Sequence, residues 1–225
     1  MMIKTLYVMI LAVLTLVGQA KQKFQCLYFQ KPSTVPDTVQ VYMNGKLLQE
    51  MPLQSHYFCD TIELKPAQEV VLTFTDKVVA EPEALAGYPS VSVSREWQSF
   101  VLLAFDDPKN TLLPIRFVPM NATAPQFKNG DIKFMNMTQY VVTGKLGAQT
   151  LDLPPRKVRT LNGFCKAGAD FKVEVDIIKP ESRKPRQALF YQGWRYNTEI
   201  RKLAFVYQKE GSKRVVYYVA DIIGL

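Results

Sequence analysis

The chain is poor in the residue types that most often carry out chemistry. Its 225 residues include one histidine and three cysteines. A Ser-His-Asp or Cys-His catalytic site would therefore have to use His56. The sequence also lacks a Gly-rich phosphate loop, a Gly-x-Ser-x-Gly elbow and a Cys-x-x-Cys pair. These absences argue against an enzyme. We therefore predict that the protein has no catalytic residues and no cofactor.

Metal-ligand patterns are also missing. His56, Cys59 and Asp60 are close in sequence, but in a strand His56 and Asp60 would share one face and Cys59 would point to the other. Zinc usually takes four ligands that converge on one point. The acidic turn Asp106–Asn110 offers few of the six to eight oxygens that calcium prefers. We therefore predict no metal site.

Long apolar runs are absent after the N-terminus. Leu6–Val17 is a run of twelve residues interrupted by one threonine, whereas a membrane-spanning helix needs about 20 apolar residues. Lys4 precedes the run and Gly18–Ala20 ends it with small residues, which predicts a secretory signal peptide over residues 1–20. We expect the mature chain to be periplasmic or extracellular, with no transmembrane anchor.

Short motifs recur about 100 residues apart, the length of one domain. Gly45–Leu47 (Gly-Lys-Leu) returns at Gly144–Leu146, Leu103–Phe105 (Leu-Ala-Phe) returns at Leu203–Phe205, and the two tryptophans are Trp97 and Trp194. The offsets are 99, 100 and 97 residues. This near-constant offset predicts two copies of one domain, residues 21–125 and 126–225, with a polar connection near Ala122–Gly130.

Alternation of apolar and polar residues dominates each copy. Thr38–Met43 and Phe171–Ile177 alternate with a period of two, which is typical of half-buried strands. Asn44-Gly45 is a strong hairpin signal. Ile200–Gln208 and Arg214–Ile222 flank a further polar turn. About seven strands per copy and no long amphipathic helix predict an all-β fold of two tandem antiparallel immunoglobulin-like β-sandwich domains.

Two strings carry a resemblance to a known group of proteins. Val39–Gly45 lies near the start of the first copy, and Phe134–Thr138 lies at the start of the second. In these strings and in its overall pattern the chain resembles bacterial exported proteins with two tandem immunoglobulin-like domains of unknown function. The resemblance implies a two-sandwich architecture and a cell-envelope setting, and it brings no catalytic residues with it.

Three cysteines allow one disulfide at most. Cys26 and Cys59 both fall in the first copy, and export permits a disulfide, so we predict that these two pair. Phe58-Cys59 is echoed by Phe164-Cys165, but equivalent positions would place Cys59 and Cys165 in different domains. Three reduced and buried cysteines are the remaining alternative.

Positive charge is concentrated in the second copy. Residues 21–130 contain 10 basic and 11 acidic residues, whereas residues 131–225 contain 17 and 9. The predicted binding set for an anionic partner is Lys179, Arg183, Lys184, Arg186, Arg195, Arg201 and Lys202. An envelope polymer, a lipid head group or an acidic protein surface would suit it better than nucleic acid, because the protein is expected to be exported. The alternative is a solvated loop, or a loop that pairs with the acidic residues of Ala80–Trp97 in the first copy.

Aromatic residues in the same segment support another hypothesis. Tyr191, Trp194 and Tyr196 would form the stacking platform of a carbohydrate-binding module; otherwise the tryptophans are core anchors. A third hypothesis is a hydrolase with a site between the domains, which requires converging carboxylates or His56. Our leading prediction is a non-enzymatic exported binding or structural module of the cell envelope.

Overall fold

The structure, a computed structural model, describes residues 21–124, 126–182, 184–208 and 214–225. Apart from one 3-10 helix, η1 (Pro82–Leu85), all regular secondary structure in these ranges is β-strand. The predicted all-β fold is therefore confirmed. The same ranges contain no helix with the length and apolar character needed to cross a bilayer. The predicted signal peptide and the polar turn at 209–213 lie outside the described residues.

The first domain contains eight described strands in two packed sheets. Its outer sheet has the order β3 (Lys46–Pro52), β2 (Thr38–Met43), β5 (Val70–Thr75), β6 (Ser90–Val93). Its inner sheet has the order β4 (Ile62–Glu63), β1 (Lys23–Tyr28), β7 (Ser99–Asp106), β8 (Ile115–Asn121). The strand predicted from the alternation at Thr38–Met43 is β2, and Asn44-Gly45 forms the turn into β3 with positive φ at both residues.

The second domain repeats this arrangement with the next eight described strands. Its outer sheet has the order β11 (Gln149–Leu153), β10 (Val141–Leu146), β13 (Asp170–Ile178), β14 (Arg186–Arg195). Its inner sheet has the order β12 (Val158–Leu161), β9 (Ile132–Asn136), β15 (Arg201–Gln208), β16 (Val215–Ile222). Pairing is antiparallel throughout except between β1 and β7 and between β9 and β15, which are parallel. Both sandwiches thus share one strand order.

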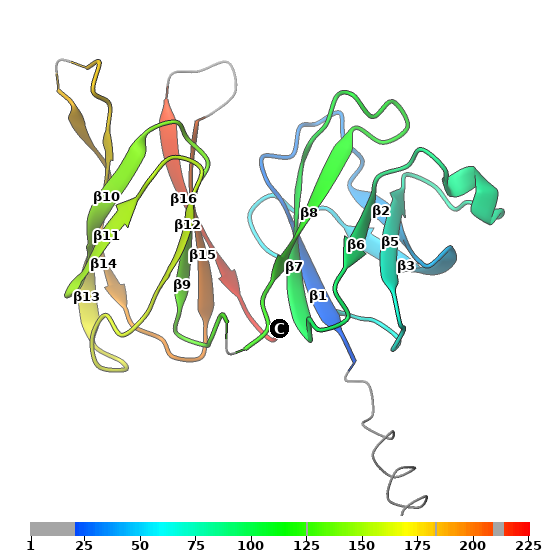
Figure 1. Cartoon of the computed structure of the whole chain (residues 1–225), viewed down its shortest axis with the longest axis horizontal. Coiled ribbons are helices and arrows are strands. Elements are labelled where there is room, and N and C mark those ends of the chain that lie inside the picture. Colours follow the sequence, from blue (N-terminus) through cyan, green and yellow to red (C-terminus); the bar gives the residue numbers. More distant parts are fainter. Residues whose placement is uncertain (1–20, 125, 183, 209–213) are drawn as a thin grey trace, which may run out of the picture.

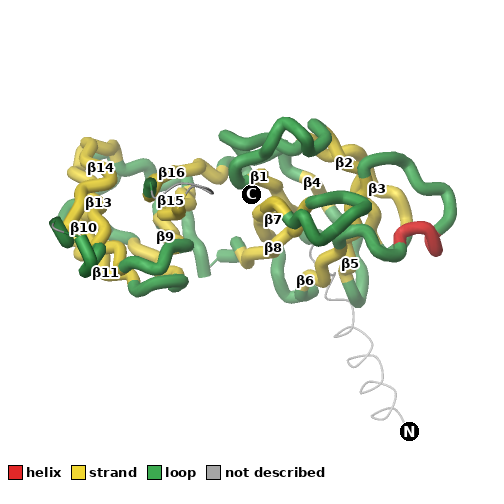
Figure 2. Tube along the Cα trace, turned by 90° about the horizontal axis from the view of Figure 1, so that it is seen from above, coloured by secondary structure: helices red, strands yellow, loops and turns green. Residues whose placement is uncertain are grey.

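The two inner sheets face each other, so the molecule has four β-layers (Figures 1 and 2). One apolar core fills each sandwich, and a third lies between the inner sheets. Strand β7 supplies two of these cores, because Leu102 and Ala104 point into the first sandwich while Val101 and Leu103 point toward the second domain. A strand that is buried on both faces reads as a continuous apolar run.

The repeated Leu-Ala-Phe motif builds this joint. Ala104 and Ala204 pack into the cores of their own sandwiches, whereas Leu103, Leu203 and Phe205 are buried in the core between the domains. The motif therefore does more than preserve each fold. It also fixes one domain against the other.

The Gly-Lys-Leu echo does not mark equivalent positions. Gly45 lies in the turn after β2, with φ +80°. Gly144 lies inside β10, where a Cβ atom would be 1.9 Å from the carbonyl oxygen of Glu174. The turn after β10 uses Gly147 instead, with φ +56°. The interpretation of this echo as a marker of the repeat is therefore wrong.

Candidate functional site

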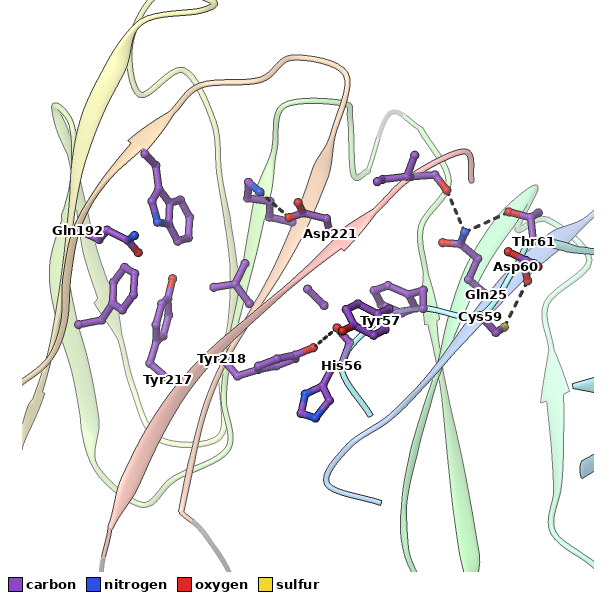
Figure 3. Close-up of a pocket in the computed structure, with 17 residues that line it drawn as sticks. Gln25, His56, Tyr57, Cys59, Asp60, Thr61, Gln192, Tyr217, Tyr218 and Asp221 are labelled. Atoms are coloured by element: carbon purple, nitrogen blue, oxygen red, sulfur yellow. Dashed lines mark hydrogen bonds and ion pairs between the residues drawn. The ribbon is translucent and has the colours of Figure 1, made fainter. Parts of the chain in front are cut away.

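A groove of about 880 Å³ lies where the second domain meets a loop of the first (Figure 3). The loop His56–Thr61 and Gln25 form one wall. The opposite wall is formed by Phe190, Gln192 and Trp194 of β14. Between the walls the groove is lined by five consecutive residues of β16, Tyr217–Asp221. Because consecutive residues of a strand point to opposite faces, the groove follows the edge of β16 rather than one face.

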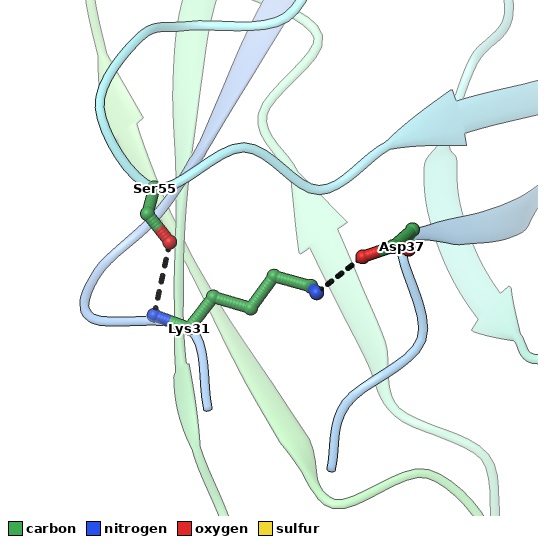
Figure 4. Close-up of polar contacts among 3 residues, drawn as sticks. All are labelled: Lys31, Asp37 and Ser55. Atoms are coloured by element: carbon green, nitrogen blue, oxygen red, sulfur yellow. Dashed lines mark hydrogen bonds and ion pairs between the residues drawn. The ribbon is translucent and has the colours of Figure 1, made fainter. Parts of the chain in front are cut away.

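The loop that forms the first wall is held against β1 and the turn that follows it. The N–H of Tyr28 donates to the carbonyl of Gln54 at 2.8 Å, and the N–H of Cys59 donates to that of Cys26 at 2.8 Å. The N–H of Lys31 donates to Oγ of Ser55 at 3.2 Å (Figure 4). The loop is therefore positioned before any ligand arrives.

Lys31 and Asp37 add an ion pair beside this anchor. Lys31 Nζ lies 2.6 Å from a carboxylate oxygen of Asp37 (Figure 4). The hydrogen bond from Lys31 lowers the pKa of Asp37 below its ordinary value. Because Asp37 is almost fully exposed, the pair contributes little to stability.

His56 connects the loop to the second domain through its backbone. Its carbonyl oxygen accepts a hydrogen bond of 2.7 Å from the hydroxyl of Tyr218, which joins the loop to β16. His56–Asp60 lie in the loop between β3 and β4, so the assumption that this segment is a strand is wrong. The described residues contain no group of three metal-ligating side chains.

Two buried polar atoms at the groove have no hydrogen-bond partner among the described residues. Gln25 is 6% exposed. Its Nε2 donates to Oγ1 of Thr61 at 3.1 Å and to the carbonyl of Ile223 at 2.9 Å, while its Oε1 has no hydrogen-bond partner in the described structure. The hydroxyl of Tyr217 is also buried without a partner there, and burial raises its pKa. Such groups are costly and uncommon in folded proteins.

Sequence reasoning missed both of these residues. Gln25 lies between apolar residues in β1. A polar residue within a buried strand was the only feature of the sequence that could have pointed to it. Nothing in the sequence distinguishes Tyr217 from the ten other tyrosines.

The predicted stacking platform is not assembled. Trp194 is half-buried and meets Phe171 edge to face at 6.2 Å between ring centroids, while Lys202 Nζ lies 5.6 Å from the centroid of its ring. Tyr196 packs edge to face against Phe171. Tyr191 is 66% exposed and, as a neighbour of Gln192, faces away from the groove. The three aromatic rings therefore do not share one surface.

Both tryptophans help to close a core. Trp97 packs against the first core next to Phe100, and Trp194 packs against the second. Trp97 precedes β7 and Trp194 lies near the end of β14, so the two residues occupy different places in their domains. The core-anchor interpretation describes both residues.

The predicted basic set does not form one patch. Arg201 is 4% exposed and donates from Nη1 to the carbonyl of Ala122 at 2.5 Å and from Nη2 to the carbonyl of Leu225. Burial lowers the pKa of its guanidinium group. Its position inside the joint between the domains shows that the prediction of contact with an anionic partner is wrong for this residue.

The other members of the set are dispersed or already paired. Lys202 pairs with Asp221, and Arg186 pairs with Asp176 at 2.6 Å. The exposed residues Lys184 and Arg195 lie near opposite ends of β14, about 30 Å apart for a ten-residue strand. Lys179 lies over the ring of Tyr140 at 5.0 Å, and Arg183 lies outside the described residues.

The three cysteines are free thiols. Cys26 and Cys59 are neighbours in the first core, as the predicted pairing requires, but Sγ of Cys59 accepts a hydrogen bond of 3.0 Å from the N–H of Cys26. The predicted disulfide is thus contradicted. Burial raises the pKa of Cys59 to about 11 and also raises the pKa of Cys26 well above its ordinary value. Cys165 is half-buried in the second domain.

Comparisons with known proteins add no family. A scan against protein-family models finds no match, and a search of curated proteins finds no match either. The groove itself is therefore the basis for a functional proposal.

Proposed function

We propose that the protein is a non-enzymatic exported binding module of the cell envelope, and that its ligand occupies the groove between the two sandwiches. One observation carries the proposal: Oε1 of Gln25 and the hydroxyl of Tyr217 are buried at this groove, and no described residue forms a hydrogen bond with either atom. A ligand with a hydrogen-bond donor for Gln25 would remove the cost of burying that oxygen.

The composition of the groove also supports binding. Binding sites usually combine apolar and aromatic side chains with a few polar groups that fix orientation. Here the aromatic rings of Phe190, Trp194 and Tyr217 line the same groove as the amides of Gln25 and Gln192. The anchored loop and the interdomain core keep the two walls in place, which reduces the entropy lost on binding.

The charges of the groove favour a neutral ligand. Lys202 and Asp221 both line the groove and form an ion pair with each other. Asp60 is a further exposed acid at this site. An anionic partner is consequently less well supported, because Arg186, Arg201 and Lys202 already have partners.

The proposal can be tested with a panel of defined probes. The mature chain (residues 21–225) would be titrated calorimetrically with a pool of linear ten-residue peptides, with chitohexaose and with heparin. We expect saturable binding of one class, weakened about tenfold or more by Gln192→Arg, whose side chain enters the groove.

A matched control separates blocking of the groove from a change in charge. Tyr191→Arg places the same side chain on the adjacent residue of β14, facing away from the groove, and should leave the affinity unchanged. Absence of binding by every probe would contradict the proposal, as would equal binding by the Gln192→Arg variant.

A further inference from the structure

The described sheets end in eight edge strands, and seven of these carry protection against pairing with another chain. Usual protections are short length, proline, basic residues and irregular register. Strands β4, β6, β11 and β12 have two to five residues. Strand β3 contains Lys46 and Pro52, and β8 contains Arg116 and Pro119. Strand β14 begins and ends with arginine and has a register irregularity against β13.

Strand β16 lacks these protections. It has eight residues, Val-Val-Tyr-Tyr-Val-Ala-Asp-Ile, without proline, lysine or arginine. It pairs with β15 in continuous register over its whole length, and with no other strand of the described chain. Its single charged residue, Asp221, is paired with Lys202. In an antiparallel edge strand, every second residue directs its N–H and C=O away from the neighbouring strand.

The free backbone of β16 lies in the groove. Side chains of β16 alternate between the two walls: Tyr217 and Val219 pack against the second core, and Tyr218 and Ala220 pack against the core between the domains. Figure 3 shows Tyr217 and Gln192 on one side of the strand and His56 and Gln25 on the other. The groove thus presents a strand edge with a wall on each side.

We propose that the groove receives an extended polypeptide segment that pairs with β16 as an added strand of the inner sheet; this inference rests on the proposed function. Main-chain hydrogen bonds to the edge would supply affinity, and pockets for alternate side chains would supply specificity. The segment would place apolar side chains against Phe190, Trp194 and Tyr217, and a hydrogen-bond donor next to Oε1 of Gln25.

Other occupants fit the groove less well. A saccharide would need an open aromatic face, but the ammonium group of Lys202 lies over the ring of Trp194. Pairing of β16 with a second copy of the chain would leave the unpartnered oxygen of Gln25 without a donor unless a side chain of that copy reached it. Both occupants are outcomes of the test below.

The test begins with a phage-displayed library of linear ten-residue peptides selected on the mature chain. The peptide that binds most tightly would be synthesised unmodified and in two methylated forms. One form carries N-methyl groups on the odd-numbered residues, and the other carries them on the even-numbered residues. We expect one methylated form to lose about tenfold or more in affinity, because it cannot donate backbone hydrogen bonds to β16. Hydrogen exchange should show new protection in Val215–Ile222 on binding of the unmodified peptide and none in Ile115–Asn121.

A pair of variants gives an independent measurement. Val219→Lys adds an edge lysine beside the groove and should weaken the peptide about tenfold. Val118→Lys makes the same change at a half-buried valine of the edge strand β8 and should have no effect. If Val219→Lys unfolds, as circular dichroism would reveal, the methylated peptides still decide the question.

The outcomes separate this inference from the proposed function. Binding of chitohexaose in the groove, with no peptide selected, would overturn strand addition and leave the proposed function in place. Concentration-dependent dimers that protect β16 without peptide would do the same. If both methylated peptides bound as tightly as the unmodified peptide, strand addition would also be overturned. Failure of all probes to bind would overturn both proposals.

Discussion

The hydroxyl of Tyr218 donates a 2.7 Å hydrogen bond to the backbone carbonyl of His56 and so joins β16 to the first domain. Tyr218 belongs to the core between the two inner sheets. This contact closes the joint beside the groove, so the rigidity of the groove and the coupling of the domains depend on the same strand.

Replacing Tyr218 with phenylalanine removes only this hydrogen bond. We expect the free energy of unfolding to fall by about 1 kcal/mol, as measured by urea denaturation. Tyr207→Phe is the control, because Tyr207 packs in the same core and its hydroxyl makes no hydrogen bond in the described structure. Equal losses in the two variants would contradict the importance of the Tyr218 hydrogen bond.

Phe205→Ala tests whether the core between the domains makes them unfold together. Phe205 is fully buried in that core, so its truncation should cost about 3–5 kcal/mol. We expect one calorimetric transition for the mature chain and two for the variant. The equivalent residue Phe105 is half-buried, so Phe105→Ala should lower the free energy of unfolding by a smaller amount. A variant that still shows one transition would contradict this role of the core.

Arg201→Met separates a structural role from a binding role. Loss of the guanidinium group removes the hydrogen bonds that Arg201 donates to the carbonyls of Ala122 and Leu225, and the Ala122 carbonyl keeps only its bond from the Ser99 hydroxyl. This change should cost about 1–3 kcal/mol of stability. The exposed Arg195 should cost less than about 0.5 kcal/mol when changed to methionine. Retention on heparin should fall more for Arg195→Met. If Arg201→Met reduced heparin retention more than Arg195→Met, Arg201 would again be a candidate for anion binding.

Gly144→Ala tests the close approach of β10 and β13. The added Cβ would lie 1.9 Å from the carbonyl oxygen of Glu174, so the backbones must separate. We expect a loss of about 3 kcal/mol in thermal or urea unfolding. Gly193 lies in β14 with no atom within 4 Å of an added Cβ, and Gly193→Ala should change stability by less than about 1 kcal/mol. Similar stabilities for the two variants would contradict this packing.

Burial of Cys59 predicts a loss of stability in alkali. Its pKa is raised from 9.0 to about 11 by desolvation, so the thiol ionises more readily in the unfolded chain than in the folded chain. Its stabilising contribution is complete below pH 9.0 and declines as the pH rises toward 11. Relative to Cys59→Ser, the mature chain should lose about 2–3 kcal/mol across this range. Urea unfolding at several pH values measures the difference, and parallel curves would contradict the prediction.

Local patterns were enough to predict the strands. The alternation in Thr38–Met43 and the Asn44-Gly45 turn predicted β2 and its hairpin with the observed bounds. Ile200–Gln208 and Arg214–Ile222 match β15 and β16 to within one residue at each end. These predictions succeed because side-chain alternation and turn conformation depend on neighbours in the chain.

Local sequence was therefore enough to predict an all-β chain, most strand positions and the concentration of positive charge in the second half. The burial of Arg201 and the position of Gln25 across the groove from β16 followed from the packing of the sheets. Burial and hydrogen bonding depend on which sheets pack together, and residues far apart in the chain settle that. The Leu-Ala-Phe motif shows both levels, since its apolar character predicts strands, whereas the packing of the inner sheets makes it the joint between two domains.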